Sequence, residues 1–400
     1  MIPLRHVVMA ASVLPHHSIG GMQTVAWDLA RALVAGGLEV TVLTAEIPGR
    51  DSEFIDAGVA IRALPKTRWR HYGPSWWRAT RNAFESGTIE RCDLLLSVSA
   101  AGFGLLPLRE RIPRVPFVMQ AHGTSMGEFV SKWRARSLKS MLTSPRNLAW
   151  VAKDMAAYPR FDAIVAVGDR VAQALATSPT RWAVDPAKVH VIKNGIDTAT
   201  FRPDPDAGRR VRADLGWDPD LRVVVSASRL HRQKGLSHGL RAFAQLAAGR
   251  TDLRYLIVGD GPELAALRRE AASLRIDRYV HFAGPVGRVA MAAYLNAADV
   301  MLFTTTHVEG EPLNVLESLA VGLPAVVSRH LYPGTSPSDH IRRATPTDPA
   351  EVAAALRSAL ALRAPRLSRL PPGYAASSTV AQYVALFERL VRERAAAERG

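Results

Sequence analysis

The stretch from Glu309 to Glu317, with a glutamate at each end, is the part of the chain best suited to chemistry. The apolar run 299–303 before it predicts a buried strand, and Pro312 stands where a helix commonly begins. The N–H groups and positive dipole end of such a helix suit a phosphate. Glu317, inside the helix, can accept hydrogen bonds from two ribose hydroxyls. The segment therefore predicts a nucleotide-sugar site, and a surface helix with acidic residues near its start is the alternative.

Two basic residues in the second half are spaced to grip one diphosphate. Arg229 and Lys234 lie in a loop between a predicted strand, 222–226, and a predicted helix. Arginine offers a bidentate fork and lysine a compact point charge, which suits a nucleoside diphosphate that leaves with added negative charge. Because basic loops are common, a solvated loop is the alternative.

Three residues in the first half follow predicted strands. Gly20 and Gly21 come after the strand 7–13, where missing side chains allow backbone N–H groups to approach a phosphate or sugar, although a mere turn explains them equally well. His122 comes just after the strand 116–120. We interpret His122 as a contact to the sugar, and a structural histidine is the alternative.

The candidate metal ligands do not form a convincing metal site. Asp-x-Asp patterns, which metal-dependent sugar transferases use, occur at 204–206 and 218–220, but both lie in proline turns rather than at the end of a buried strand. The single cysteine, Cys92, excludes an intramolecular disulfide and a Cys-based metal cluster, and it fits a reducing cytoplasm. The sequence therefore predicts no metal.

Short apolar runs alternate with longer amphipathic stretches, which is typical of an α/β protein with parallel sheets. The predicted strands form two series, 7–13, 39–44, 94–98, 116–120 and 163–167, then 222–226, 254–258, 280–282, 300–303 and 325–328. The proline-containing stretch 176–187 is a plausible hinge between two similar sheets, and 378–398 is helical in pattern. Ligands of such proteins usually bind in a cleft between the domains, outside the carboxyl ends of the strands.

The composition fits two soluble globular domains. The chain has 400 residues, 48% of them hydrophobic, and its longest uncharged stretch, 94–108, is too short and too interrupted by glycine and proline for a transmembrane helix. The apolar run 7–14 indicates a first strand rather than a signal peptide. These features predict a cytoplasmic protein that is soluble or peripheral on the inner face of the membrane.

The net charge of +15 favours anionic partners. Two acid-free basic segments, 62–81 and 131–153, also carry tryptophans, and such segments can lie on an anionic membrane surface. The alternative is a solvated basic face with packed tryptophans. No zinc-finger spacing, RNA-stacking signature or basic zipper supports nucleic acid as a partner.

Taken together, these elements resemble the retaining glycosyltransferases of family four, whose GT-B fold has two Rossmann-like domains facing a central cleft. The resemblance rests on Gly20-Gly21, His122, the segment 191–203, Arg229 with Lys234, and the stretch 309–324. It implies an acceptor domain at 1–180, a nucleotide-sugar donor domain at 181–375, and a C-terminal helix at 376–400 that packs back on the first domain.

The resemblance also implies roles for individual residues. Arg229 and Lys234 would bind the donor diphosphate, Glu317 the ribose, and Glu309 and His122 hydroxyls of the transferred sugar. The remaining donor contacts would come from Gly20, Gly21, Gly284, Val286, Leu313 and Asn314, with the backbone around Gly284 and Val286 near the base and the N–H groups of Leu313 and Asn314 on the phosphate. One departure is the segment 329–334, where the family often has a glycine pair and a glutamate.

The implied reaction moves a hexose from a UDP- or GDP-linked donor to a hydroxyl with retention of configuration, without metal or cofactor. The leaving phosphate can itself take the acceptor proton. The basic, tryptophan-bearing segments favour a lipid-linked or glycan acceptor of the cell envelope. A small soluble aglycone such as an antibiotic precursor stays open, and so does a non-catalytic nucleotide-sugar-binding module. A nucleotide-sugar epimerase on the same fold is a further alternative.

Overall fold

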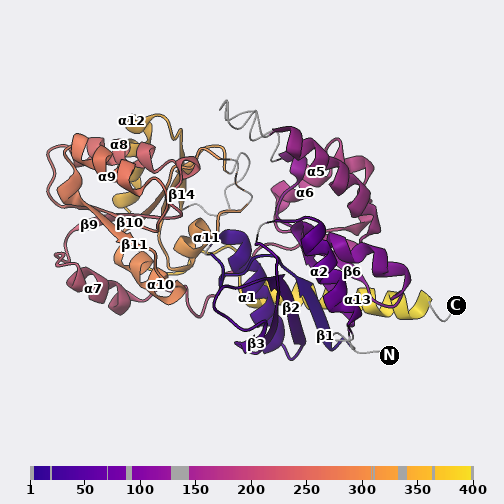
Figure 1. Ribbon diagram of the computed structural model, residues 1–400. Helices are drawn as coiled ribbons and strands as arrows, with labels where there is room; N and C mark the ends of the chain where they lie inside the picture. The colour runs from indigo at the N-terminus through magenta and orange to yellow at the C-terminus, as the bar shows by residue number, and fades with distance from the viewer. Residues whose placement is uncertain are drawn as a thin grey trace. The chain divides into compact units, whose positions relative to one another are not determined.

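The computed structural model describes residues 4–397 except 19, 70, 87–91, 128–143, 308, 310, 332–339 and 363–364, and gives only the backbone of 144–147. The chain forms two compact units (Figure 1). The first holds Met1–Gly195 and Ala376–Gly400, and the second holds Ile196–Ala375. Among the described residues, no helix is long and apolar enough to cross a membrane.

The first unit is built on a sheet with strand order β3-β4-β2-β1-β5-β6-β7-β8, parallel except for the antiparallel pair β3–β4. Its strands are β1 His6–Ala10, β2 Glu39–Ala45, β3 Glu53–Asp56, β4 Val59–Leu64, β5 Leu94–Val98, β6 Phe117–Ala121, β7 Ala163–Ala166 and β8 Val189–Val191. Its helices are α1 Gly21–Ala35, α2 Pro74–Glu85, α5 Ser144–Ala157, α6 Asp169–Leu175 and α13 Ala376–Ala397, with a 3-10 segment η1 Ser99–Glu110.

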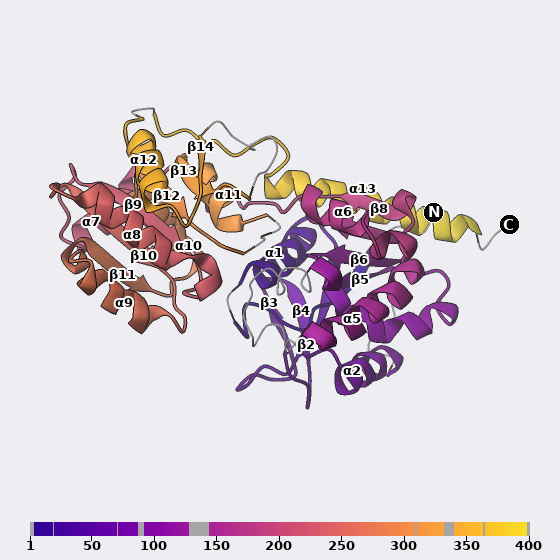
Figure 2. The same cartoon turned by 90° about the horizontal axis from the view of Figure 1, so that it is seen from above.

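Alternate residues of β1 enter two different cores, because side chains along a strand point to opposite faces. Val7 and Met9 pack with residues of α1 and α13, whereas Val8 and Ala10 pack with Trp76 of α2 and with η1. Figure 2 shows α13 along one side of this sheet and α2 on the other. Coverage of both faces explains why the strands are almost continuously apolar.

The second unit is built on a parallel sheet with strand order β11-β10-β9-β12-β13-β14. Its strands are β9 Arg222–Ala227, β10 Leu253–Val258, β11 Val280–Gly284, β12 Val300–Phe303, β13 Ala325–Ser328 and β14 Ile341–Ala344. Its helices are α7 Pro205–Asp214, α8 Leu236–Ala247, α9 Leu264–Ser273, α10 Arg288–Ala297, α11 Leu313–Ala320 and α12 Pro349–Leu360. Helices α8, α9 and α12 cover one face, and α10 and α11 cover the other (Figure 1).

The change from the first unit to the second comes later than the sequence suggested. The chain leaves the first unit after Gly195 rather than at 180, because β8 still pairs with β7. The stretch 176–187, where the sequence predicted a hinge, lies inside the first unit. The chain enters the second unit at Ile196 and leaves it at Ala375, and these two residues form a β-bridge.

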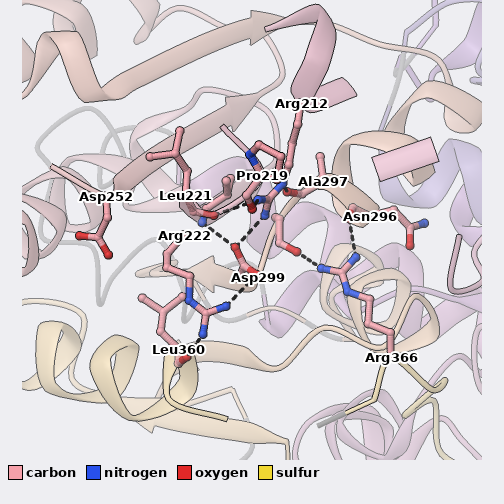
Figure 3. A network of polar contacts seen from close by, with 12 residues as sticks. Arg212, Pro219, Leu221, Arg222, Asp252, Asn296, Ala297, Asp299, Leu360 and Arg366 are labelled. Atoms are coloured by element: carbon pink, nitrogen blue, oxygen red, sulfur yellow. Dashed lines mark hydrogen bonds and ion pairs between the residues drawn. The ribbon is translucent and has the colours of Figure 1, made fainter. Parts of the chain in front are cut away.

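A network of charges closes the amino-terminal edge of the second sheet (Figure 3). Asp299, just before β12, accepts hydrogen bonds from Arg212 Nη2 at 2.8 Å, Arg222 Nη1 at 3.4 Å and the Val223 N–H at 2.8 Å. Arg212 also donates to three backbone carbonyls, and Arg222 also donates to the carbonyl of Leu360. This edge is therefore held together by charge-assisted hydrogen bonds within the protein.

Candidate functional site

The loop after β9 and the loop after β12 are joined by hydrogen bonds at the carboxyl edge of the second sheet. Thr304 Oγ1 donates to the Gly235 carbonyl at 2.8 Å, and Thr305 Oγ1 donates to the Gln233 carbonyl at 2.9 Å. Gly235 has φ 68°, and a Cβ there would lie 1.9 Å from the Thr304 carbonyl oxygen. Only glycine therefore allows the two loops to approach this closely.

This junction brings Lys234 and Glu309 together. Lys234 Nζ donates to Glu309 Oε1 at 2.7 Å. Thr305 Oγ1 lies 3.1 Å from the same oxygen and shares its single proton between it and the Gln233 carbonyl. The Lys234 and Glu309 side chains keep 22% and 16% of their surface exposed. The pair is thus fixed in place and still reachable by a ligand.

Helix α11 begins beside this pair, with Pro312 as its N-cap and no capping side chain. The N–H groups of Leu313 and Asn314 donate to no residue in the described part of the chain. The Asn314 side chain donates to the Ala227 carbonyl at 2.8 Å, which ties the helix to the end of β9. An anchored helix start with available N–H groups is suited to an anion.

Arg229 lies on the loop after β9 and is exposed. Its guanidinium makes no hydrogen bond or ion pair with any described residue. The turn at 259–261 packs closely against this loop, because a Cβ on Gly259 would lie 2.1 Å from the Ser228 carbonyl oxygen. Arg229 is thus a cation on a fixed loop with its donors available.

Glu317 is 8% exposed and lies within α11. Its Oε1 accepts a hydrogen bond from Arg288 Nη1 at 3.3 Å, and the Arg288 guanidinium lies 5.0 Å from the centroid of the Phe201 ring. Arg288 opens α10, shortly after Gly284 and Val286 at the end of β11. The contact therefore links the segment expected near the base with the glutamate expected on the ribose.

Gly20, Gly21 and His122 belong to the first unit, at the carboxyl edge of its sheet. Gly20 is the N-cap of α1, which starts at Gly21 without a capping side chain. His122 follows β6, and its Nε2 lies 2.9 Å from Gln120 Oε1. Burial lowers the pKa of the His122 imidazole to about 4, although the residue as a whole keeps partial exposure, so it is neutral at neutral pH.

The tryptophans of the basic segments are mostly packed. Trp76 is buried and donates Nε1 to the Ala101 carbonyl at 2.8 Å, while Lys153 Nζ lies 4.2 Å from the Trp150 ring and 5.0 Å from the Trp77 ring. Trp69 is 38% exposed, beside the exposed residues Lys66 and Arg68. Arg70 and the stretch 131–143 of the second segment lie outside the described residues.

The two Asp-x-Asp patterns have local structural roles. Asp204 caps α7 by accepting from the Ala207 N–H at 2.9 Å, and Asp218 accepts from the Asp220 N–H at 2.8 Å within a turn. Of the segment that departs from the family pattern, residues 332–334 lie outside the described part, while Arg329 pairs with Glu351. The absence of a metal requirement stays a prediction.

The structure adds four side chains that the sequence did not indicate. Arg288 and Thr305 contact the two glutamates, while Gln120 and Tyr383 connect His122 with α13. No sequence motif links any of these side chains to the residue that it contacts. A basic residue at the start of α10, directly after a glycine, is the only local signal for Arg288.

Comparison with known proteins gives two family matches. The model described as Glycosyltransferase Family 4 matches residues 19–200, and the model described as Glycosyl transferases group 1 matches residues 209–370. Together they span most of both units.

Individual proteins agree with these matches. A 2-deoxystreptamine glucosyltransferase of Streptomyces kanamyceticus is 25% identical over 378 residues, 88% of this chain and 92% of the relative. A D-inositol 3-phosphate glycosyltransferase of Jonesia denitrificans is 26% identical over 340 residues, 77% of this chain and 75% of the relative. The solved structure of Anabaena HepE in complex with UDP and glucose has a TM-score of 0.67 and 18% identity, covering 99% of this chain and 100% of HepE.

Proposed function

Because the chain belongs to the glycosyltransferases of family four and has their GT-B fold, we propose that it transfers a hexose from a UDP- or GDP-linked donor to a hydroxyl with retention of configuration. The observation that carries the donor half of this proposal is the anchored Lys234–Glu309 pair beside the available N–H groups at the start of α11. Anabaena HepE, of similar fold, binds UDP and glucose.

The donor diphosphate is expected between the basic loop and α11. Lys234 keeps two further N–H donors while it is bound to Glu309, and Arg229 offers its whole guanidinium fork. The N–H groups of Leu313 and Asn314 add an electrostatic contact that strengthens as negative charge develops on the leaving phosphate. These groups reduce the barrier to bond cleavage without a metal.

Glu317 is the expected ribose acceptor. Its carboxylate accepts a hydrogen bond from Arg288, and a carboxylate is an acceptor-only group that suits the two hydroxyls of a vicinal diol. Glu309 can accept from a sugar hydroxyl, and neutral His122 can exchange a hydrogen bond with another. No side chain is assigned as general base, since the leaving phosphate oxygen can take the acceptor proton.

A transfer assay tests the reaction. Purified protein is incubated with UDP-glucose or GDP-mannose, with and without a panel of lipid-linked and soluble acceptors, and the product is followed by proton NMR of its anomeric signal. We expect an α-linked product that forms only with an acceptor present. A β-linked product contradicts retention, donor conversion without any acceptor favours an epimerase, and binding without turnover favours a non-catalytic module.

A cell-envelope acceptor at a membrane surface is supported by one surface feature. Lys66, Arg68 and Trp69 are all exposed on the loop after β4, at the same carboxyl edge of the first sheet as His122. Basic residues near anionic head groups contribute about 1 kcal/mol each, and tryptophan favours the interface. The alternative acceptor is a small soluble aglycone.

Flotation with anionic vesicles separates the two acceptor classes. Wild type is expected to float at low salt, and the variant Lys66→Glu/Arg68→Glu/Trp69→Ser is expected to stay behind. Trp182→Ser is the matched control, because Trp182 is 68% exposed on the same unit and should not alter flotation. Failure of the wild type to float removes the membrane proposal and leaves the soluble acceptor.

A further inference from the structure

A chain of three side chains connects the C-terminal helix with His122. Tyr383 of α13 accepts a hydrogen bond from Gln120 Nε2 at 2.8 Å, and Gln120 Oε1 lies 2.9 Å from His122 Nε2. Gln120 and Tyr383 are each 1% exposed. The contact spans 263 positions of sequence and lies wholly within the first unit.

The direction of these bonds decides where the histidine proton sits. Gln120 turns its NH2 group to Tyr383, so its carbonyl oxygen faces His122. A carbonyl oxygen only accepts, and the neighbouring Nε2 must therefore carry a proton. Because the ring is neutral, Nδ1 then carries a lone pair and acts as an acceptor.

We propose that Tyr383 and Gln120 are positioning residues that fix the ring orientation and the Nε2–H tautomer of His122. Nδ1 can then accept a hydrogen bond from a hydroxyl of the transferred sugar. The part of this inference that concerns the sugar rests on the proposed function. The part that concerns the tautomer rests on the contacts alone.

The burial of the chain explains why it can hold one arrangement. Burial raises the pKa of the Tyr383 hydroxyl, which stays protonated, and no other titratable side chain is bonded to Gln120 among the described residues. Tyr383 itself is held by packing, since its ring lies 5.6 Å from that of Phe387 and both belong to the core between α13 and the sheet. The helix thus keeps its place without the hydroxyl.

Tyr383→Phe isolates the hydroxyl, because it leaves the ring and its packing in place. Gln120 then loses the partner that orders its amide, and His122 is free to exchange between its two neutral tautomers. Tyr255→Phe is the matched control. Tyr255 is equally buried, and its hydroxyl is also engaged in a 2.8 Å bond, to Ser226 Oγ of the second unit.

Nitrogen-15 NMR of histidine-labelled protein reads the tautomer without any substrate. The chain has 12 histidines, and the His122→Gln variant assigns the signal. Wild type and Tyr255→Phe are expected to show His122 with Nε2 protonated and Nδ1 bare at pH 7. Tyr383→Phe is expected to shift both nitrogens toward the average of the two tautomers. A wild-type signal with Nδ1 protonated, or no change in Tyr383→Phe, overturns the proposal.

Kinetics then test the link with the sugar. We expect Tyr383→Phe to lower kcat by about tenfold with KM for the donor nearly unchanged, and to cause no further loss in a His122→Ala background. An additive loss in that background contradicts positioning through His122. A protein that shows the expected NMR change but no transfer with any donor refutes the proposed function and leaves the positioning of His122 intact.

Discussion

The two edges of the second sheet carry similar charged residues and use them differently. At the amino edge, Arg212 and Arg222 share Asp299, and each also donates to backbone carbonyls (Figure 3). At the carboxyl edge, Lys234 has a single carboxylate partner and Arg229 has no partner among the described residues. A cluster of charges paired within the protein stabilises the fold, whereas unused donors on fixed loops are suited to a ligand.

The helix starts show the same difference. Helix α7, near the amino edge, is capped by Asp204. Helix α11, at the carboxyl edge, begins with Pro312 and has no capping side chain. A missing cap forgoes about 1 kcal/mol of stability and leaves N–H groups for an anion.

The largest expected effect follows Lys234→Ala at the carboxyl edge. Transfer should fall by about a thousandfold, because a donor aimed at the leaving phosphate is lost. The free energy of unfolding should fall by only about 1 kcal/mol, since the ion pair with Glu309 is partly exposed. Lys188→Ala is the control, because the bonds that Lys188 makes with described residues go to backbone carbonyls of the first unit. Full activity in Lys234→Ala would break the comparison.

Arg212→Met should do the opposite at the amino edge. Removing one partner of a largely buried pair leaves Asp299 undercompensated, and we expect a loss of about 3 kcal/mol in the free energy of unfolding by urea titration. The transfer rate of the folded fraction should stay unchanged. A lower affinity for donor nucleotide with normal stability would show that this edge is not purely structural.

Arg229→Lys tests whether the bidentate guanidinium of Arg229 is needed for binding. The charge stays but the bidentate fork is lost, so the affinity for UDP or GDP should fall by about tenfold. Stability should not change, because the guanidinium makes no hydrogen bond or ion pair with any residue that the structure describes. Arg232→Lys, an exposed position on the same loop, is expected to leave the affinity unaltered. Equal losses of affinity in the two variants would show that Arg229 has no specific role in binding the diphosphate.

The sequence predicted the residues of the carboxyl edge because strand, loop and helix follow one another there in short motifs. The ten predicted strands are all present, whereas β3, β4, β8 and β14 were missed. Strand β4 was missed because Arg62 was assigned to a basic segment. In the structure, residues of β4 are alternately buried, and Arg62 pairs with Glu53.

Contacts between segments that are distant in sequence could not be predicted. Tyr383 reaches Gln120 only because α13 packs against the sheet of the first unit, and a tyrosine in an amphipathic helix carries no sign of its partner. Arg288 reaches Glu317 for a similar reason, since the sheet order brings the end of β11 and α11 to the same edge. Similarly, the packing of Trp76 depends on η1, which the apolar run 94–108 did not predict.

The most direct test of the account is calorimetric titration of UDP and GDP into the wild type, Glu317→Ala and Glu270→Ala proteins. Glu270 bonds to Arg241 on the surface of the same unit and serves as the matched control. We predict that one nucleotide binds to the wild type and to Glu270→Ala with equal affinity, and that Glu317→Ala binds it at least about tenfold more weakly. Equal binding by all three proteins would contradict a nucleotide site at the carboxyl edge of the second sheet.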